Sequence, residues 1–377
     1  MHALTLLSLP TPPTRILVLE RSPTQLLHNQ GAGIVASPDV QQYFQEYVKP
    51  GREIVVRSKL RHYLDRKGAV VEGSVEEREQ RMTSWELVYG LLREKVTQRN
   101  EVELKWGCTV LGVEEIEGGG GGVKVKWNEK DGEKSEVANL VIGADGASST
   151  VRRLLLPQVE RKYCGYVAWR GTVPETQLSD AAKEAFIEKF TFFHTSGIQT
   201  LGYLIPGHEG SVEPGRRLFN WVWYCNYENG SSELEELMTD IHGRRHKITL
   251  PPDTMQAHVW EKQKAYAQEV LPPQFAEAVM KTEHPFIQAV TDVISPNNRF
   301  FGDKVILVGD ALAGFRPHTA ASTGQAAFDA LQLGKLFRGE LRLEEYHEAV
   351  MEFATRVQKS GVMMGERSQF GRHPFAS

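Results

Sequence analysis

Several features that define other protein classes are scarce in this sequence. Its three cysteines, Cys108, Cys164 and Cys225, are odd in number and scattered, so they predict neither a disulfide framework nor a metal site and suit a reducing compartment. No apolar run approaches the ~20 residues that a membrane-spanning helix needs. The net charge is only −4, which does not indicate a nucleic acid or an anionic membrane as a partner. We therefore expect a cytoplasmic protein with no metal and no membrane anchor.

What is present suits a large enzyme. The length of 377 residues suggests two or three domains, and an apolar share of 41% is enough for a sizeable core. Five consecutive glycines, Gly118 to Gly122, predict a surface loop between two strands. Hydrophobic periodicity predicts helices at about 84–100, 179–189, 231–245 and 344–364. It predicts strands at 15–20, 53–72 (strand, turn, strand), 102–106, 109–117, 123–127, 163–174 and within 199–225.

The stretch from Lys304 to Asp329 is the most informative. The apolar run Val305 to Val308 predicts a buried strand, and a helix is expected from about Thr319. Gly309 and Asp310 follow the strand at once. A helix N-terminus offers free N–H groups and a positive dipole, which suit a phosphate or an electron-poor ring. Taken alone, this stretch is also typical of an ordinary strand–helix unit with a glycine turn.

A second strand ends in the same way. Leu140-Val-Ile-Gly143-Ala-Asp145-Gly146 leads into a basic helix start with Arg152 and Arg153. The two stretches, in this order, resemble the second and third nucleotide motifs of the FAD-dependent aromatic hydroxylases, which are single-component flavoprotein monooxygenases. Three further stretches, 29–34, 165–171 and 316–321, are similar to the 2,6-dihydroxypyridine hydroxylase branch of that family. The resemblance covers about residues 15–365.

One motif of that family is missing. The family opens with a strand, a G-x-G-x-x-G turn and a helix that cradle the FAD pyrophosphate, and this sequence has no such turn. Met1 to Leu9 reads instead as the second half of the first helix, and Arg15 to Glu20 as the second strand. We therefore expect the chain to begin inside the first βαβ unit. The alternative function is then a non-catalytic homologue, or a truncated gene model, that binds FAD weakly.

The resemblance implies an α/β fold. A three-layer, Rossmann-like FAD-binding domain would be assembled from both ends of the chain, with a β-rich substrate domain inserted between them. The expected parts are residues 1–155 (first FAD-binding part), 156–296 (substrate domain) and 297–377 (second FAD-binding part and C-terminal helix). Ligands of open α/β sheets lie in the crevice at the carboxyl ends of the strands.

The resemblance also implies which residues contact the cofactor. An acid at the end of the second strand, Glu20, would bind the adenosine ribose. Arginines are candidates for phosphate neutralisation because guanidinium matches phosphate oxygens, although solvated surface charges explain them nearly as well. A turn-capping role is the alternative for Asp145, and a plain glycine turn for residues 31–33. The expected cofactor-binding set is Glu20, Arg21, Gly31, Ala32, Gly33, Arg81, Asp145, Gly309, Asp310, Thr319, Ala320 and Ala321.

Pro317 and His318 are expected at the flavin face, with His318 as a ring contact and not a base. Substrate residues are expected in the aromatic β region: His194, Tyr203, Trp221 and Trp223. Strand alternation places Trp221 and Trp223 on one face, although most aromatic residues of such a layer belong to the core. His194 or Tyr203 could act as the general base for a phenolic substrate.

The reaction implied is hydroxylation of an aromatic or N-heteroaromatic small molecule. NADH or NADPH would reduce FAD, and O2 would add to flavin C4a to give the hydroperoxide that transfers oxygen to the ring. The resemblance admits a homodimer and a role in either catabolism or secondary metabolism. A reductase or a halogenase on the same scaffold is a further alternative, but the sequence shows no convincing halogenase lysine motif.

Overall fold

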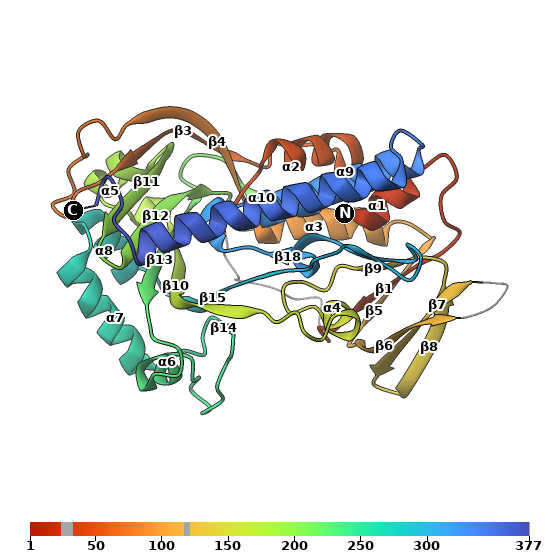
Figure 1. The fold of residues 1–377 in the computed structure, drawn as a ribbon. Helices are drawn as coiled ribbons and strands as arrows, with labels where there is room; N and C mark the ends of the chain where they lie inside the picture. The colour runs from red at the N-terminus through yellow and green to blue at the C-terminus, as the bar shows by residue number, and fades with distance from the viewer. Residues whose placement is uncertain (24–32, 117–120, 377) are drawn as a thin grey trace.

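A computed structural model describes residues 1–23, 33–116 and 121–376 (Figure 1). Its helices are α1 (His2–Leu7), α2 (Pro38–Tyr43), α3 (Trp85–Thr97), α4 (Thr150–Leu155), α5 (Asp180–Phe186), α6 (Ser232–Leu237), α7 (Ala257–Val270), α8 (Pro273–Met280), α9 (Ser322–Phe337) and α10 (Leu343–Gln369). In this part of the chain no helix is both long and apolar enough to pass through a bilayer.

The strands of the N-terminal half are β1 (Ile16–Glu20), β2 (Gly33–Val35), β3 (Val56–Tyr63), β4 (Glu76–Ser84), β5 (Val102–Trp106), β6 (Thr109–Ile116), β7 (Gly122–Glu129), β8 (Gly132–Ala138) and β9 (Val141–Gly143). Those of the C-terminal half are β10 (Lys162–Pro174), β11 (Lys189–Thr195), β12 (Ile198–Ile205), β13 (Leu218–Asn226), β14 (Thr249–Leu250), β15 (Phe286–Ile294), β16 (Arg299–Phe300), β17 (Val305–Leu307) and β18 (Ala313–Gly314).

Parallel pairing joins the two ends of the chain. β9 runs parallel to β17, with Gly143 opposite Leu307, and β16 closes the edge of this sheet. β1 runs parallel to β5 in a second, two-stranded sheet. The predicted assembly of an α/β unit from both ends of the chain is therefore confirmed. The predicted hairpin of β6 and β7 is also confirmed, and β8 extends it.

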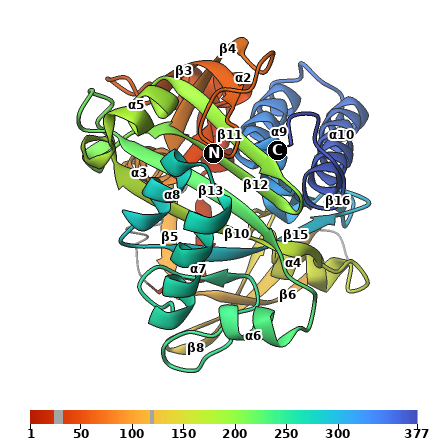
Figure 2. The ribbon, with the colours of Figure 1, turned by 90° about the vertical axis from the view of Figure 1, so that its left-hand side faces the viewer.

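A ten-stranded sheet forms the other half of the molecule. Its order is β14-β15-β10-β13-β12-β11-β3-β4-β2, with β18 paired to β15. β2, β3 and β4 come from residues 33–84, so this sheet also draws on chain outside the range 156–296. Helices α5, α7 and α8 cover one of its faces (Figure 2), and α10 crosses the other side of the molecule (Figure 1).

Local signals explain where several elements begin and end. Ser84 caps α3 by accepting a hydrogen bond from the amide of Leu87. α9 begins at Ser322, three residues later than predicted, because residues 317–319 form a 3-10 turn and Ala320 is left-handed (φ 51°). The second strand predicted within 53–72 was wrong: β4 starts only at residue 76, and a single bridge joins Leu64 to Val70. The helix predicted at 231–245 ends at residue 237.

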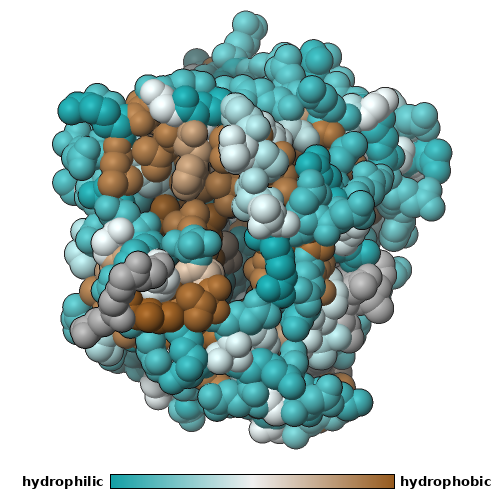
Figure 3. Space-filling view, turned by 90° about the vertical axis from the view of Figure 1, so that its right-hand side faces the viewer, coloured by the Kyte–Doolittle hydropathy of each residue, from teal (hydrophilic) through white to brown (hydrophobic). Residues whose placement is uncertain are grey.

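The apolar side chains of β1 are only half-buried along its whole length, Ile16 to Leu19. Strands of a parallel sheet are normally buried on both faces. Seen from the right-hand side of Figure 1, the molecule shows a gathering of apolar side chains around a hollow (Figure 3). This half of the molecule is therefore less completely covered than the half that holds the ten-stranded sheet.

Candidate functional site

A cavity of about 680 Å³ lies between the ten-stranded sheet and the N-terminal end of α9. Side chains of a strand alternate between its two faces, so every second residue of β3, β11, β12 and β13 contributes to the cavity wall, whereas consecutive residues of β2 and β4 border it. β3, β4 and β10 contribute Arg61, Tyr63, Gln80 and Arg170. β11, β12 and β13 contribute Phe190, Phe192, His194, Gln199, Leu201, Tyr203, Val222 and Tyr224. This wall is mainly aromatic and aliphatic, with a few polar groups.

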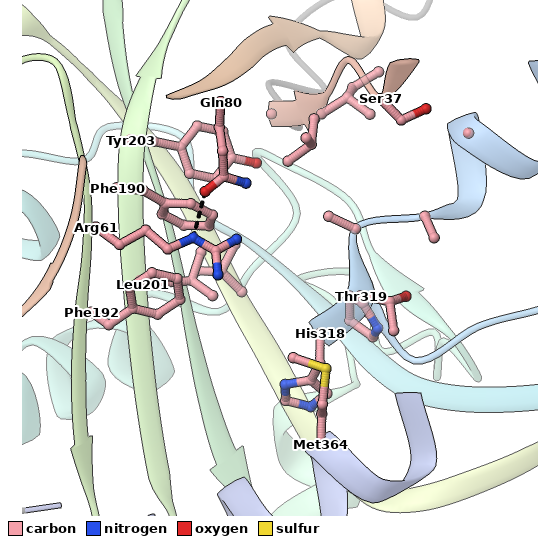
Figure 4. Close-up of a pocket in the computed structure, with 18 of the residues that line it drawn as sticks. Ser37, Arg61, Gln80, Phe190, Phe192, Leu201, Tyr203, His318, Thr319 and Met364 are labelled. Atoms are coloured by element: carbon pink, nitrogen blue, oxygen red, sulfur yellow. Dashed lines mark hydrogen bonds between the residues drawn. The ribbon is translucent and has the colours of Figure 1, made fainter. Parts of the chain in front are cut away.

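The opposite wall is the loop 317–321 and the first turn of α9 (Figure 4). His318 Nε2 lies 2.9 Å from the hydroxyl of Tyr166, while His318 Nδ1 is buried with no partner. Burial, with the charge of Arg316 second, lowers the pKa of His318 to about 3. The imidazole is therefore neutral at physiological pH. The hydroxyl of Thr319 is also buried without a partner.

The N-terminus of α9 borders the cavity without a side-chain cap. Ala321 stands at the cap position and offers no side-chain acceptor. Ser322, Thr323 and Gly324 of the first turn line the cavity. First-turn amides have no partner within the helix, and the helix dipole adds partial positive charge there. This end of α9 can therefore stabilise an anionic or electron-rich edge of a ligand.

The two acidic turns identified in the sequence are neighbours. They follow β9 and β17, which pair in parallel. Arg152 connects them: its Nη1 donates to the carbonyls of Asp310 (3.4 Å) and Ala311 (2.6 Å), and its Nη2 to that of Ala147 (2.5 Å). The carboxylate of Asp145 accepts hydrogen bonds from residues 149–151 and so caps α4. The turn-capping interpretation of Asp145 thus describes its contacts within the chain.

Asp310 is held differently. Its Oδ1 is buried with no partner among the described residues, and burial raises the pKa of its carboxyl. Gly309 before it is left-handed (φ 55°), a conformation that favours glycine. Two side chains of α9 fix this turn: Asp329 Oδ2 accepts from the Gly309 amide (2.8 Å), and Gln325 donates to the Gly309 carbonyl. Sequence reasoning missed Asp329 and Gln325, although polar residues four apart in an apolar helix were an available signal.

The other expected cofactor residues are placed less closely around the cavity. Glu20 ends β1 and accepts from the amide of Ser22 (2.7 Å), and Arg21 is exposed; neither lines the cavity. Arg81 lines it and pairs with Glu79 at 3.5 Å.

Gly33 also lines the cavity, and its amide donates to Asn220 Oδ1 (3.0 Å). A side chain at this position would meet the Tyr203 hydroxyl at 2.7 Å. The absence of a side chain therefore lets β2 pack against the wall of the cavity. Gly31 and Ala32 lie outside the described residues.

Two of the four expected substrate residues face the cavity. His194 is buried, stacks on His373 at 3.8 Å and leaves Nδ1 without a partner. Burial first, then His373 and His318, lowers the pKa of His194 to about 2, so it is neutral. Burial raises the pKa of Tyr203.

Trp221 and Trp223 require a correction. They share a face, as predicted, but it is the opposite face of the sheet, where both are 0% exposed and pack with Trp169 in the core under α7 and α8. One residue of offset along β13 decides the face: Val222 and Tyr224 reach the cavity instead. Tryptophan burial in this core removes both side chains from any contact with a ligand in the cavity.

Comparison with known proteins identifies the family to which a chain with this geometry belongs. A family model described as FAD binding domain-like matches residues 163–292. The 2,6-dihydroxypyridine 3-monooxygenase of Paenarthrobacter nicotinovorans is 33% identical over 359 residues, which cover 91% of this chain and 86% of that protein. The chain belongs to the FAD-dependent aromatic hydroxylases.

Two solved structures agree with this hydroxylase fold. The 2,6-dihydroxypyridine-3-hydroxylase from Arthrobacter nicotinovorans superposes with a TM-score of 0.81 at 28% identity, covering 95% of this chain and 89% of that one. PqsL of Pseudomonas aeruginosa, a probable FAD-dependent monooxygenase, has a TM-score of 0.65 at 19% identity, covers 93% of this chain and 88% of its own, and shows the fold alone. The predicted α/β FAD-binding fold, the monooxygenase class and the FAD cofactor are confirmed.

The residues of this hydroxylase fit a flavin. Three buried polar atoms lack a partner among the described residues: Thr319 Oγ1 and His318 Nδ1 in the cavity wall, and Asp310 Oδ1 in the turn after β17. Buried polar groups of a folded protein nearly always have a hydrogen-bond partner. The uncapped α9 terminus adds backbone donors. A group rich in hydroxyls, amides and ring carbonyls satisfies such a set.

Proposed function

We propose that the enzyme hydroxylates a planar aromatic or N-heteroaromatic small molecule, using O2 and NADPH or NADH. The observation that carries this proposal is the cavity itself, since a wall of Phe190, Phe192 and Leu201 faces the wall of orphaned polar groups near His318 and Thr319 (Figure 4). A flat ring can lie against the first wall while FAD lies along the second. By its name, the 33% identical relative acts on 2,6-dihydroxypyridine, which supports a heteroaromatic substrate.

FAD supplies the redox chemistry when bound, by accepting electrons from NAD(P)H and activating O2. In this proposal Asp310 accepts hydrogen bonds from ribityl hydroxyls. The first-turn amides of α9, with Thr319, Ala320 and Ala321 before them, bind the electron-rich edge of the ring. Pro317 and His318 contact the ring face. The roles predicted from the resemblance are kept in this proposal: Glu20 contacts the adenosine ribose, Arg21 and Arg81 neutralise phosphates, and Asp145 contacts FAD.

The protein's own part in catalysis is to orient the substrate and exclude water. Burial lowers the pKa of His194 to about 2, so its imidazole is neutral and too weak a base to remove the proton of a phenol. Its ring nitrogen can instead accept a hydrogen bond from a phenolic hydroxyl. Its unpartnered Nδ1 needs such a polar contact. Tyr203, whose pKa is raised by burial, keeps its proton and can donate a hydrogen bond to a ring substituent. Replacing water with these fixed groups favours the reaction with the substrate over side reactions with water.

A substrate screen tests the proposal. The protein is expressed as the full chain, loaded with FAD and offered phenols and hydroxypyridines with NADH or NADPH. We expect one class of substrate to stimulate NAD(P)H oxidation, with a product heavier by one oxygen atom by mass spectrometry. We also expect His194→Ala to lower kcat for phenolic substrates by about 10²-fold, because the substrate loses a positioning hydrogen bond, while the flavin spectrum is unchanged. Oxidation of NAD(P)H that releases only hydrogen peroxide with every substrate would contradict the proposal.

A second candidate is a homologue that binds FAD weakly and does not hydroxylate. It is favoured by one observation: β1 and β9 lie in two separate sheets, and the side chains of β1 are half-exposed. The visible spectrum of the purified protein separates the candidates. Flavin bands near one FAD per chain support the hydroxylase, whereas a colourless protein that gains no flavin on titration supports the second candidate.

Three further predictions from the sequence enter this proposal. The chain is divided into a first FAD-binding part (1–155), from which β2 to β4 join the substrate sheet, a substrate domain (156–296) and a second FAD-binding part (297–377). The enzyme works in the cytoplasm, which cell fractionation tests. It forms a homodimer, which light scattering tests.

A further inference from the structure

The cavity described above carries an excess of positive charge. Its lining contains five arginines, and its acids among the described residues are Asp39 and Glu79. Two of the arginines are paired: Arg81 with Glu79 at 3.5 Å and Arg78 with Glu76 at 3.6 Å. The remaining three, Arg61, Arg170 and Arg367, make no ion pair within the described part of the chain. An uncompensated charge in a half-closed space attracts an anion.

Arg61 is one of the arginines without an ion pair among the described residues, and its side chain points into this space. It extends from β3 between the aromatic wall and the loop that holds His318 (Figure 4). Its Cζ lies 5.4 Å from the ring centre of Phe190 and 5.8 Å from that of Phe192. Its Nε donates to Gln80 Oε1 at 2.5 Å. The side chain is therefore fixed along its stem, while the described residues supply no partner for its two Nη groups.

The fixed geometry and the missing partner point to one chemical group. Burial lowers the pKa of Arg61, which reports a partly desolvated guanidinium. A guanidinium in this state is stabilised by an acceptor that takes up its two parallel N–H bonds, and a carboxylate matches that fork in shape and charge. Cation–π contacts with Phe190 and Phe192 use the plane of the guanidinium and leave this edge free. A neutral hydroxyl would satisfy only one of the two donors.

We propose that the substrate of this hydroxylase is an aromatic or heteroaromatic acid whose carboxylate is bound by the Nη groups of Arg61. This inference rests on the proposed function, because it names the substrate class of the same site. The ring then lies against Phe190, Phe192 and Leu201, and the carbon to be hydroxylated points away from Arg61 toward the loop of His318. Arg61 is thus a specificity-determining residue that holds the substrate at the end opposite to the chemistry.

Isothermal titration calorimetry with matched acids and amides tests this assignment. The probes are the monohydroxybenzoates and the corresponding hydroxybenzamides, which differ in charge but hardly in shape. The wild-type protein should bind at least one acid about 10- to 100-fold more tightly than its amide, the range for a charged hydrogen-bonded contact. Arg61→Gln should abolish this preference, and Arg61→Lys should restore part of it because lysine keeps the charge but lacks the fork.

Arg78→Gln is the matched control. Arg78 borders the same cavity but is exposed and paired with Glu76, so its loss should change the preference for acids by less than about threefold. Equal affinity of the wild type for acids and amides would overturn the proposal, as would equal losses in Arg61→Gln and Arg78→Gln. If Arg61→Gln fails to fold, the wild-type preference and the Arg61→Lys variant decide alone.

Each titration is run with and without added FAD. Failure to bind FAD contradicts the proposed function, but the acid preference of the cavity can still be measured because Arg61 and the aromatic wall belong to the protein. An FAD-bound enzyme that hydroxylates neutral phenols and ignores acids supports the proposed function and overturns this inference. The two proposals therefore fail in different ways.

Discussion

At the scale of single residues, Asp329 is the clearest example of a side chain that acts through another. It lies inside α9, fully buried, and holds the Gly309 amide that precedes Asp310. Burial, opposed by that hydrogen bond and supported by the nearby Asp310 charge, raises its pKa to about 8. The folded state therefore favours the neutral acid. This contribution to stability is complete below the unfolded pKa, near 4, and is lost as the pH rises through about 8.

We expect Asp329→Asn to change this pH dependence. Asparagine has nearly the same shape and cannot ionise, so the variant should lose less stability than the wild type between about pH 4 and pH 8. The difference amounts to about 1.4 kcal/mol for each pKa unit at most. Urea unfolding at pH 5 and pH 8 measures it, and parallel changes in both proteins would show that Asp329 is not buried as a neutral acid.

Gly33 gives a second prediction at this scale. A methyl group there would stand 2.7 Å from Tyr203 and from Asn220, so Gly33→Ala should lower the free energy of unfolding by about 1–3 kcal/mol through overpacking. It should also disturb binding in the cavity. Gly90→Ala is the control, because nothing lies near that position in α3 and alanine favours a helix by about 1 kcal/mol. Equal effects of the two changes on stability would contradict this account.

Much of the site could be anticipated residue by residue, with clear limits. The motifs around Asp145 and Asp310 located the neighbouring strand ends, because a glycine and an acid after an apolar run mark such an end. Strand alternation paired Trp221 with Trp223 but could not tell which face of the sheet the helices cover. Arg61 gave no signal at all, since its importance depends on strands β11 and β12, far away in the chain, that form the rest of the wall.

At the scale of elements, the side chain of Arg316 forms an ionic bridge between α10 and the substrate sheet. Arg316 is 9% exposed, and it pairs with Asp292 of β15 (2.7 Å) and Glu366 of α10 (2.8 Å). The Asp292 side chain is only 16% exposed, whereas that of Glu366 is 53% exposed. The carboxylate of Asp292 therefore depends on its ion pair with Arg316 more than that of Glu366 does, because water can solvate Glu366. The loop that contains Arg316 continues into Pro317 and His318, so these two ion pairs also help to position one wall of the cavity.

Replacing Arg316 should lower the free energy of unfolding strongly, whereas replacing Glu366 should lower it only slightly. Arg316→Met leaves Asp292 as a nearly buried charge with only the thiol of Cys164 as a donor among the described residues, so we expect a loss of about 3 kcal/mol in the free energy of unfolding. Glu366→Gln removes only an exposed partner and should cost less than about 1 kcal/mol. Chemical denaturation of the two variants measures the ratio. Similar losses of unfolding free energy in the two variants would show that the Arg316–Asp292 pair contributes no more to stability than the exposed pair with Glu366.

Element boundaries followed from sequence where local chemistry decides them. Ser84 before α3 is a capping residue that can be recognised in the sequence. The start of α9 could not be placed so well, because the left-handed Ala320 is imposed by the packing of the loop and not by its own residue type. β4 was missed for a similar reason: its polar residues 76–80 alternate poorly, and pairing with β3 is what makes them a strand.

At the scale of the whole molecule, the account depends on the chain leaving the parallel sheet after β9 and returning to it at β17. This path brings residues 145 and 310 to one edge and places the aromatic sheet beside it. The two-ended assembly could be predicted because both ends carry related motifs. The participation of β2 to β4 in the substrate sheet could not, because pairing between distant strands leaves no local pattern.

FAD titration of the wild type and of Asp310→Ala, followed by quenching of flavin fluorescence, tests the central claim most directly. We expect saturable binding near one FAD per chain, weakened about tenfold or more in Asp310→Ala because a buried acceptor is removed. Asp145→Asn keeps a side-chain oxygen that can accept a hydrogen bond and most of the cap of α4, so it should weaken FAD binding less than Asp310→Ala does. Absence of flavin binding by the wild type, or unchanged affinity in Asp310→Ala, would contradict the account.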